Sequence, residues 1–301
     1  MNLTKTPSTF ERLVFPVFTI LVIVLLKLVP ELISPSAQLI SLAILVACFG
    51  LPHGALDPWI AEVIGIRQTP GQNFIFILVY IAIAGMVIVT WVLAPAISLL
   101  SFLAISVWHF SDDWKFYMVR PLRLCMGLLL LLMPIGFHTE NVGVIFAHLS
   151  GERGVDIANT LALPAGLLVS GMALLIGCAL WARQWLLALE YFALLSLAYL
   201  TPPLIYFIFY FCLLHSPRHL MSLFRETSST EYPRLLRMIV TYSLATFLLL
   251  GLLFWLWSDL SFDSMILRLV FIGLAAVTVP HMVLIAIAHF HKQHIAGWTR
   301  N

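Results

Sequence analysis

Long apolar segments alternate with short polar ones along the whole chain. A helix that crosses a bilayer needs about 20 mainly apolar residues. Ten segments meet that requirement: 12–30, 36–56, 72–93, 95–114, 121–138, 161–182, 184–200, 202–221, 236–257 and 264–290. The shortest, 184–200, also suits a re-entrant segment. The pattern predicts an all-α, polytopic membrane helix bundle of about ten transmembrane helices, forming a single membrane-embedded domain over residues 1–301.

Prolines support these segment ends, because a missing backbone N–H costs least at a helix terminus. They are Pro95, Pro121, Pro202, Pro203 and Pro233. Between the spans, residues 139–160 are expected to form an outer connection that can include a short interfacial helix. Residues 222–234 are polar and are expected to form a cytoplasmic loop.

Composition excludes an ordinary soluble domain. The chain is 61% hydrophobic and 10% charged, whereas soluble domains are about 45–50% apolar and about 25% charged. No basic run with interleaved aromatics indicates nucleic acid binding. The apolar run at residues 13–29 follows Lys5 and Arg12 and reads as a signal anchor. Membrane lipid is therefore the expected surrounding of this protein.

The basic residues predict an orientation, because Lys and Arg collect on the cytoplasmic side. With the N-terminus inside and ten alternating spans, only Lys27, Arg153 and Arg268 of the 16 Lys and Arg residues fall outside. This bias supports an even number of spans, with both termini cytoplasmic. The predicted location is the inner cell membrane, crossed many times.

Three short polar boxes interrupt the apolar chain and carry four histidines. An ionisable residue inside a membrane span is a functional-site candidate by default. The boxes contain His53 with Asp57, His109 with Asp112 and Asp113, and the pair His215 and His219. The topology, which uses only Lys and Arg, puts all four histidines near the cytoplasmic ends of their spans. A single metal held inside the helix bundle is the expected result.

The neighbours of these histidines suggest supporting roles. His215 and His219 are spaced i, i+4 and share a helix face, while Pro217 between them is expected to loosen the turn. Asp57 is a candidate to orient His53 through its second ring nitrogen, and Asp112 or Asp113 to orient His109. Interfacial solvation is the competing interpretation of these aspartates.

Other side chains complete the list of candidates. His281 follows Pro280 inside the last span and can be an outer-shell group, a pocket wall or a fifth ligand. His138 and His148 fall near the outer face, and His289, His291 and His294 near the cytoplasmic tail. Aromatic residues around the boxes are candidates to shape a long apolar pocket: Trp108, Phe110, Tyr206 and Tyr210.

Imidazole suits iron, copper, zinc and nickel alike. An all-histidine site without thiolate, and with open positions, fits Fe(II) chemistry with O2. Zinc hydrolysis usually uses three protein ligands and a water. The residues alone thus favour iron only modestly.

The boxes Pro-His53-Gly-x-x-Asp57, Trp-His109-Phe-x-x-Asp, His215-x-Pro-x-His219 and Pro-His281 resemble those of the bacterial and archaeal Brp/Blh family of β-carotene 15,15′-dioxygenases. The resemblance follows motif order over nearly the whole chain. It implies a polytopic membrane enzyme that cleaves β-carotene centrally with Fe(II) and O2 into two all-trans-retinal molecules. It also implies that His53, His109, His215 and His219 bind the iron, and it leaves His281 open.

The resemblance makes a carotenoid dioxygenase the leading hypothesis. A retinal-binding rhodopsin that uses the product retinal is then an expected functional partner. A second hypothesis is another membrane non-haem iron oxygenase or desaturase acting on a lipid or another carotenoid. Desaturases carry more histidine boxes than the single HxxxH found within a span here. A third hypothesis is a transporter with a His and Asp proton relay, which the clustering of charges at span ends disfavours.

Overall fold

The computed structural model describes residues 7–256 and 259–298, and every regular element in this part of the chain is helical. The elements are α1 (Thr9–Leu28), η1 (Pro30–Ile33), α2 (Pro35–Leu45), η2 (Val46–Gly50), η3 (Leu51–Leu56), α3 (Asp57–Val63), α4 (Pro70–Leu93), α5 (Pro95–Ser111), η4 (Asp112–Trp114), α6 (Arg120–Phe137), α7 (Thr139–Ser150), α8 (Arg153–Trp181), α9 (Trp185–Leu200), α10 (Pro203–Tyr210), η5 (Phe211–His215), α11 (Ser216–Glu226), η6 (Ser229–Glu231), α12 (Tyr232–Leu256) and α13 (Phe262–Trp298). The all-α prediction is confirmed for these residues.

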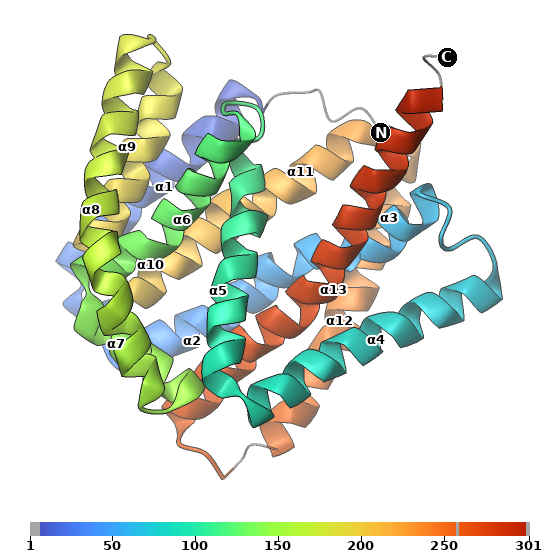
Figure 1. The fold of residues 1–301 in the computed structure, drawn as a ribbon, viewed down its shortest axis with the longest axis horizontal. Helices are drawn as coiled ribbons and strands as arrows, with labels where there is room; N and C mark the ends of the chain where they lie inside the picture. The colour runs from blue at the N-terminus through green and yellow to red at the C-terminus, as the bar shows by residue number, and fades with distance from the viewer. Residues whose placement is uncertain (1–6, 257–258, 299–301) are drawn as a thin grey trace.

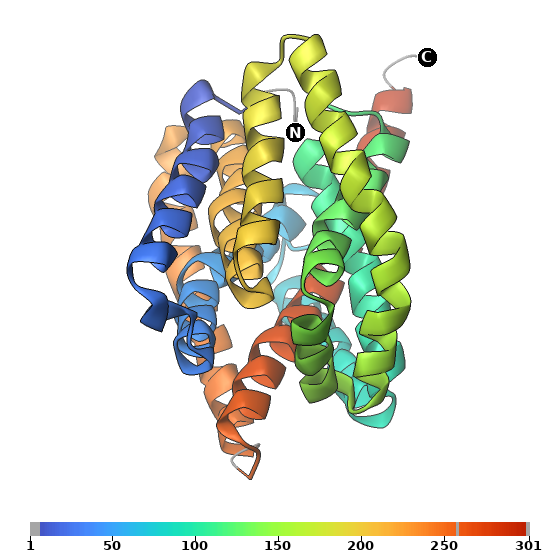
Figure 2. The same cartoon turned by 90° about the vertical axis from the view of Figure 1, so that its left-hand side faces the viewer.

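The helices form one bundle in which α5 stands near the middle (Figure 1). On one side α6 packs on α5, and α8 packs on α6, α7 and α9. On the other side α13 runs diagonally through the bundle and packs along α4. The start of α1 and the end of α13 lie at the same end of the bundle in both views (Figures 1 and 2).

Six helical segments are long and apolar enough to cross a membrane, or seven if the bent helix α8 counts as one span. The two halves of α8 meet at 41°. Three predicted spans fall short of that length or are interrupted. Helices α5 and α9 have 17 and 16 residues, and the segment 202–221 is broken by η5. A membrane helix bundle is supported, whereas the count of ten spans is not confirmed.

The outward helix faces are apolar. The most hydrophobic stretch of α4 has a mean hydropathy of 2.7, yet only 6% of it is buried inside the bundle. Large side chains such as Phe74, Ile81 and Val92 remain exposed along α4. Such a surface suits contact with lipid chains.

Both predicted connections are largely helical, which the prediction allowed for residues 139–160 but not for the predicted loop 222–234. Residues 139–160 contain all of α7 and the first turns of α8. Val142 and Phe146 of α7 are buried, because α7 packs on α8 as part of the bundle. Residues 222–234 contain the end of α11, the turn η6 and the start of α12. Both segments are too polar to be apolar spans, but a polar face does not prevent helix formation.

Candidate metal centre

Two of the histidine boxes lie on irregular helical turns. The turn Phe211–His215 is a π-helix, and Pro217 occupies the start of the following helix α11. The turn Val46–Gly50 is also a π-helix and leads into the tight turn η3, which carries Pro52. A proline cannot donate the helical hydrogen bond, so the preceding turn loosens as predicted. Such π-turns occur frequently at functional sites.

The two π-turns pack directly on each other. The hydroxyl of Ser216 donates a hydrogen bond to the carbonyl oxygen of Phe49. A Cβ atom on Gly50 would lie 2.5 Å from Cε1 of Phe211. Only glycine allows this close approach, which holds the η3 turn against the helix that carries His215.

Four imidazoles from three separate parts of the chain meet inside the bundle. The Nε2 atoms of His109 and His215 are 3.0 Å apart, and their ring centroids are 4.5 Å apart. The ring of His281 lies 5.3 Å from that of His109 and 5.1 Å from that of His219. His109, His215 and His281 are buried, and His219 is half-buried. The structure thus brings His109 and His215 together and connects them to His219 through the ring of His281, whereas their common depth in the membrane stays a prediction.

The side chain of His53 lies outside the described side chains. Its backbone belongs to η3, which packs against α11, α12 and α13. These neighbours include the helices that carry His219 and His281. The role of His53 as a ligand remains a prediction.

Two buried aspartates hold the outer nitrogens of two of these rings. Nδ1 of His215 is 3.1 Å from both carboxylate oxygens of Asp113. Nδ1 of His281 is 2.6 Å from Oδ1 of Asp57. A carboxylate at Nδ1 stabilises the tautomer with its proton there, which leaves the Nε2 lone pair for a metal.

The structure places both aspartates beside imidazoles of other chain segments. Asp57 hydrogen-bonds His281 of α13, and its predicted role in orienting His53 stays a prediction, because the side chain of His53 lies outside the described side chains. Asp113 hydrogen-bonds His215, not His109, because α5 ends at Ser111 and the turn η4 redirects the carboxylate. Asp112 is half-buried and pairs with Arg123 at 3.3 Å. Asp112 therefore supports the loop rather than an imidazole.

A tyrosine hydroxyl reaches each of the two carboxylates that hold imidazoles. Tyr210 donates to Oδ2 of Asp113 at 2.7 Å. Tyr80 lies 2.9 Å from Oδ2 of Asp57 and 3.2 Å from the carbonyl oxygen of Val277. The sequence predicts Tyr210 as a residue of the site, whereas no sequence pattern marks Tyr80.

Aromatic rings cover the histidines on the apolar side. Phe110 is buried with its ring 4.8 Å from that of His215, and Phe211 stacks on His215 at 5.4 Å. Tyr206 stacks on Tyr210 at 6.3 Å and donates its hydroxyl to the carbonyl of Leu130. Phe110, Phe211 and Tyr210 thus surround the ring of His215 with aromatic carbon.

Trp108 does not take part in this cover. It is 51% exposed, because one residue along a helix rotates the side chain by about 100° from the buried His109. His138 and His148 are also apart from the cluster, as predicted. His138 contacts the carbonyl of Ala198 at 3.0 Å, and His148 contacts the hydroxyl of Ser264 at 2.8 Å.

The spacing of the imidazoles is compatible with one shared ion. Two nitrogens that bind an ion at about 2.1 Å and at right angles lie about 3.0 Å apart. The corresponding ring centres lie about 4.5 Å apart at right angles and about 5.2 Å apart at a tetrahedral angle. The observed centroid distances of 4.5, 5.1 and 5.3 Å fall in this range.

The agreement with the distances expected around one ion holds for the rings taken in pairs. Among the described side chains, which leave out that of His53, no group of three or more histidine, cysteine, aspartate or glutamate residues is arranged to hold a metal ion. The four cysteines form no disulfides with one another, and none belongs to such a group among the described residues. The donor chemistry is therefore that of neutral imidazoles backed by carboxylates.

A buried ion-pair cluster lies beside the histidines and was not predicted. Glu190 of α9 is fully buried, with Oε1 3.1 Å from Nε of Arg12 and Oε2 2.8 Å from Nη2 of Arg218. Arg218 also donates to the carbonyl of Asp113 at 3.3 Å and lies over the ring of Trp114 at 4.8 Å. The residue between Pro217 and His219 thus links the histidine box to α9 and α1.

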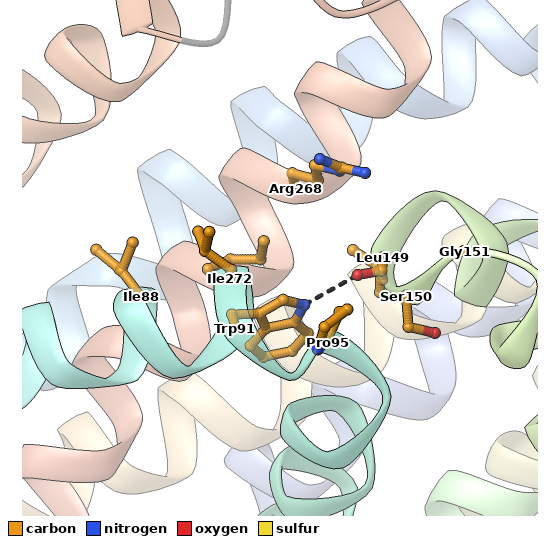
Figure 3. Close-up of a pocket in the computed structure, with 9 residues that line it drawn as sticks. Ile88, Trp91, Pro95, Leu149, Ser150, Gly151, Arg268 and Ile272 are labelled. Atoms are coloured by element: carbon orange, nitrogen blue, oxygen red, sulfur yellow. Dashed lines mark hydrogen bonds between the residues drawn. The ribbon is translucent and has the colours of Figure 1, made fainter.

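A pocket of about 340 Å³ lies where the end of α4, the start of α5, the end of α7 and α13 meet (Figure 3). Trp91 lines it and donates its indole N–H to the carbonyl of Leu149 at 3.0 Å. Pro95 also lines the pocket. It precedes His109 by 14 residues in α5, which corresponds to about 21 Å along the helix axis. This pocket is therefore distinct from the histidine cluster.

Known proteins resemble this chain over most of its length. A family model described as beta-carotene 15,15'-dioxygenase matches residues 44–289. A relative named beta-carotene 15,15'-dioxygenase, from the uncultured marine bacterium 66A03, is 30% identical over 252 residues. That alignment covers 80% of this chain and 90% of the relative. No solved structure matches the chain.

Proposed function

Because the chain belongs to the β-carotene 15,15′-dioxygenase family, an oxidoreductase family, we propose that it cleaves β-carotene at the central 15,15′ double bond with O2. The products are two molecules of all-trans-retinal. The observation that carries the proposal is the group of buried imidazoles, two of them held by buried carboxylates, inside a chain of this family.

The proposed cofactor is one Fe(II) ion, with His53, His109, His215 and His219 as its ligands. The ion, when bound, supplies the site at which O2 is activated. The support from this chain is the 3.0 Å separation of Nε2 in His109 and His215, which suits adjacent ligands of one ion. Imidazole ligands without thiolate suit non-haem iron.

The surrounding residues orient the ligands and exclude water. Asp113 accepts a hydrogen bond from Nδ1 of His215, and Tyr210 donates to the same carboxylate, so the orientation of the ring is restrained. Phe110 and Phe211 cover the ring of His215 with apolar carbon. An enzyme of this type holds the reacting bond beside the cofactor and keeps water away.

The substrate sets the expected location. β-Carotene dissolves in the bilayer core, so we expect it to enter laterally between helices. The proposed enzyme lies in the inner cell membrane with about ten crossings and cytoplasmic termini. The product retinal can then serve a retinal-binding rhodopsin in the same membrane.

The proposal is tested by expressing the chain in cells that accumulate β-carotene and measuring carotene and retinal. Loss of carotene with about two retinal molecules formed per carotene supports it. Unchanged pigment without retinal, in cells where the protein is detected in the membrane, contradicts it.

Labelled oxygen separates two routes to the same product. A dioxygenase route puts one atom of ¹⁸O2 into each aldehyde, whereas an epoxide opened by water puts one atom from water into half of them. The aldehydes are reduced to alcohols immediately, because aldehyde oxygen exchanges with water. We expect label from O2 in both halves.

A further inference from the structure

His281 and His215 are each held by the same series of hydrogen-bonded groups, in which a tyrosine contacts an aspartate and the aspartate contacts the histidine ring. In one arm, Tyr210 donates to Asp113, and Asp113 contacts Nδ1 of His215. In the other arm, Tyr80 donates to Asp57, and Asp57 contacts Nδ1 of His281. The two arms come from different helices and share no residue. Both end in an imidazole ring that neighbours His109.

We propose that His281 is a fifth imidazole ligand of the iron centre, oriented by Asp57 and Tyr80. This inference rests on the proposed function, since it concerns the same iron. The ring of His281 is 2% exposed and lies 5.3 Å from His109 and 5.1 Å from His219. In a five-coordinate site, where ligands lie about 90° or 120° apart, the ring centres of two imidazoles are about 4.5 Å or about 5.5 Å apart, and both observed distances fall between these values.

The surroundings of Asp57 give an independent argument. Its side chain is 1% exposed, and a buried carboxylate needs a compensating positive charge. Among the described residues, the groups within hydrogen-bond distance of that carboxylate are His281 and Tyr80, and no Lys or Arg forms an ion pair with it. A histidine bound to a metal supplies positive charge through the ring, as in carboxylate–histidine–metal arrangements. The geometry thus explains why an acid is tolerated at this position.

Asp113 provides the contrast. It has Arg218 beside it, whose guanidinium donates to its carbonyl oxygen and also pairs with Glu190. The Tyr210 arm therefore has a permanent cation nearby, whereas the positive charge beside the Tyr80 arm has to come from the metal ion through His281. Removing His281 deletes a proposed ligand and should weaken metal binding. Neutralising Asp57 leaves that ligand in place and should weaken metal binding less.

The test measures metal binding by the purified full-length protein, without substrate. The variants are His281→Ala and Asp57→Asn, with His148→Ala as the matched control, since His148 is a half-buried histidine bound to Ser264 outside the centre. Iron content and Co(II) titration give affinity, and the visible absorption of bound Co(II) reports coordination number. We expect His281→Ala to lose at least tenfold in affinity and to change the Co(II) spectrum. Asp57→Asn should lose about tenfold, and His148→Ala should match the wild type.

Because truncating a buried side chain can impair folding, the test also includes a variant in which free imidazole can replace the missing ring. Imidazole added to His281→Gly should restore the wild-type Co(II) spectrum if the ring is a ligand. Wild-type affinity and spectrum in His281→Ala, with β-carotene cleavage retained, overturn the ligand assignment and leave the proposed function intact. A wild-type protein that binds neither iron nor Co(II) overturns the proposed iron centre itself.

Discussion

Replacing Glu190 by Gln removes one negative charge from a fully buried cluster and preserves the size of the side chain. In the native protein Glu190 is 0% exposed and contacts both Arg12 and Arg218. The variant leaves Arg218, whose side chain is only 13% exposed, without its carboxylate. Breaking a buried ion pair in this way costs about 3–5 kcal/mol. Because both arginines retain some exposure, we expect a loss near the lower bound, about 3 kcal/mol.

The assay is thermal unfolding of detergent-purified protein, followed by tryptophan fluorescence. At about 2 °C per kcal/mol, the expected fall in Tm is about 6 °C. The control is Glu62→Gln, the same substitution in the pair between Glu62 and Arg234, whose side chains are 32% and 44% exposed. An exposed pair contributes less than about 1 kcal/mol. Equal shifts in the two variants would refute the reasoning that burial makes Glu190 important.

Three further outcomes follow from the described contacts. Asp113→Asn should lower iron affinity by about 10–100-fold, measured by competition with a chelator, because it weakens the hold on Nδ1 of His215; unchanged affinity would contradict this role. Gly127→Ala should lower Tm, since its Cβ would lie 2.2 Å from the carbonyl oxygen of Val107, whereas Gly177→Ala, with open space around it, should leave Tm unchanged or raised. Removing iron with a chelator should abolish retinal formation, and adding Fe(II) back should restore it; activity that persists in iron-free protein would exclude an iron enzyme.

The histidine positions were accessible from the sequence because each stands in a polar box within an apolar run. Polar boxes at a similar predicted depth indicate His109, His215 and His219, and the structure brings their rings together or next to a shared neighbour. Only spacing along the chain predicts their carboxylate partners. Spacing describes one helix, whereas Asp57 and Asp113 contact rings on other segments of the chain.

Two residues show different limits of sequence reasoning. Tyr80 lies in an apolar helix without a polar neighbour to mark it, and its contact with Asp57 depends on how α4 packs on α13. Glu190 carried a signal, because a lone acid in the apolar run 185–200 is costly unless it is paired. That rule, applied to acids as well as to histidines, would have identified it. Which arginines pair with it follows only from tertiary packing.

The hydrogen bond between Asp57 and His281 joins residues 224 positions apart in the chain. Membrane proteins are made and inserted from the N-terminus onward. Asp57, His109 and His215 are therefore in place before α13, the last helix of the described chain, arrives with His281. The set of imidazoles that surrounds His109 is therefore complete only after α13 has been inserted, so this centre is expected to be one of the last parts of the fold to form.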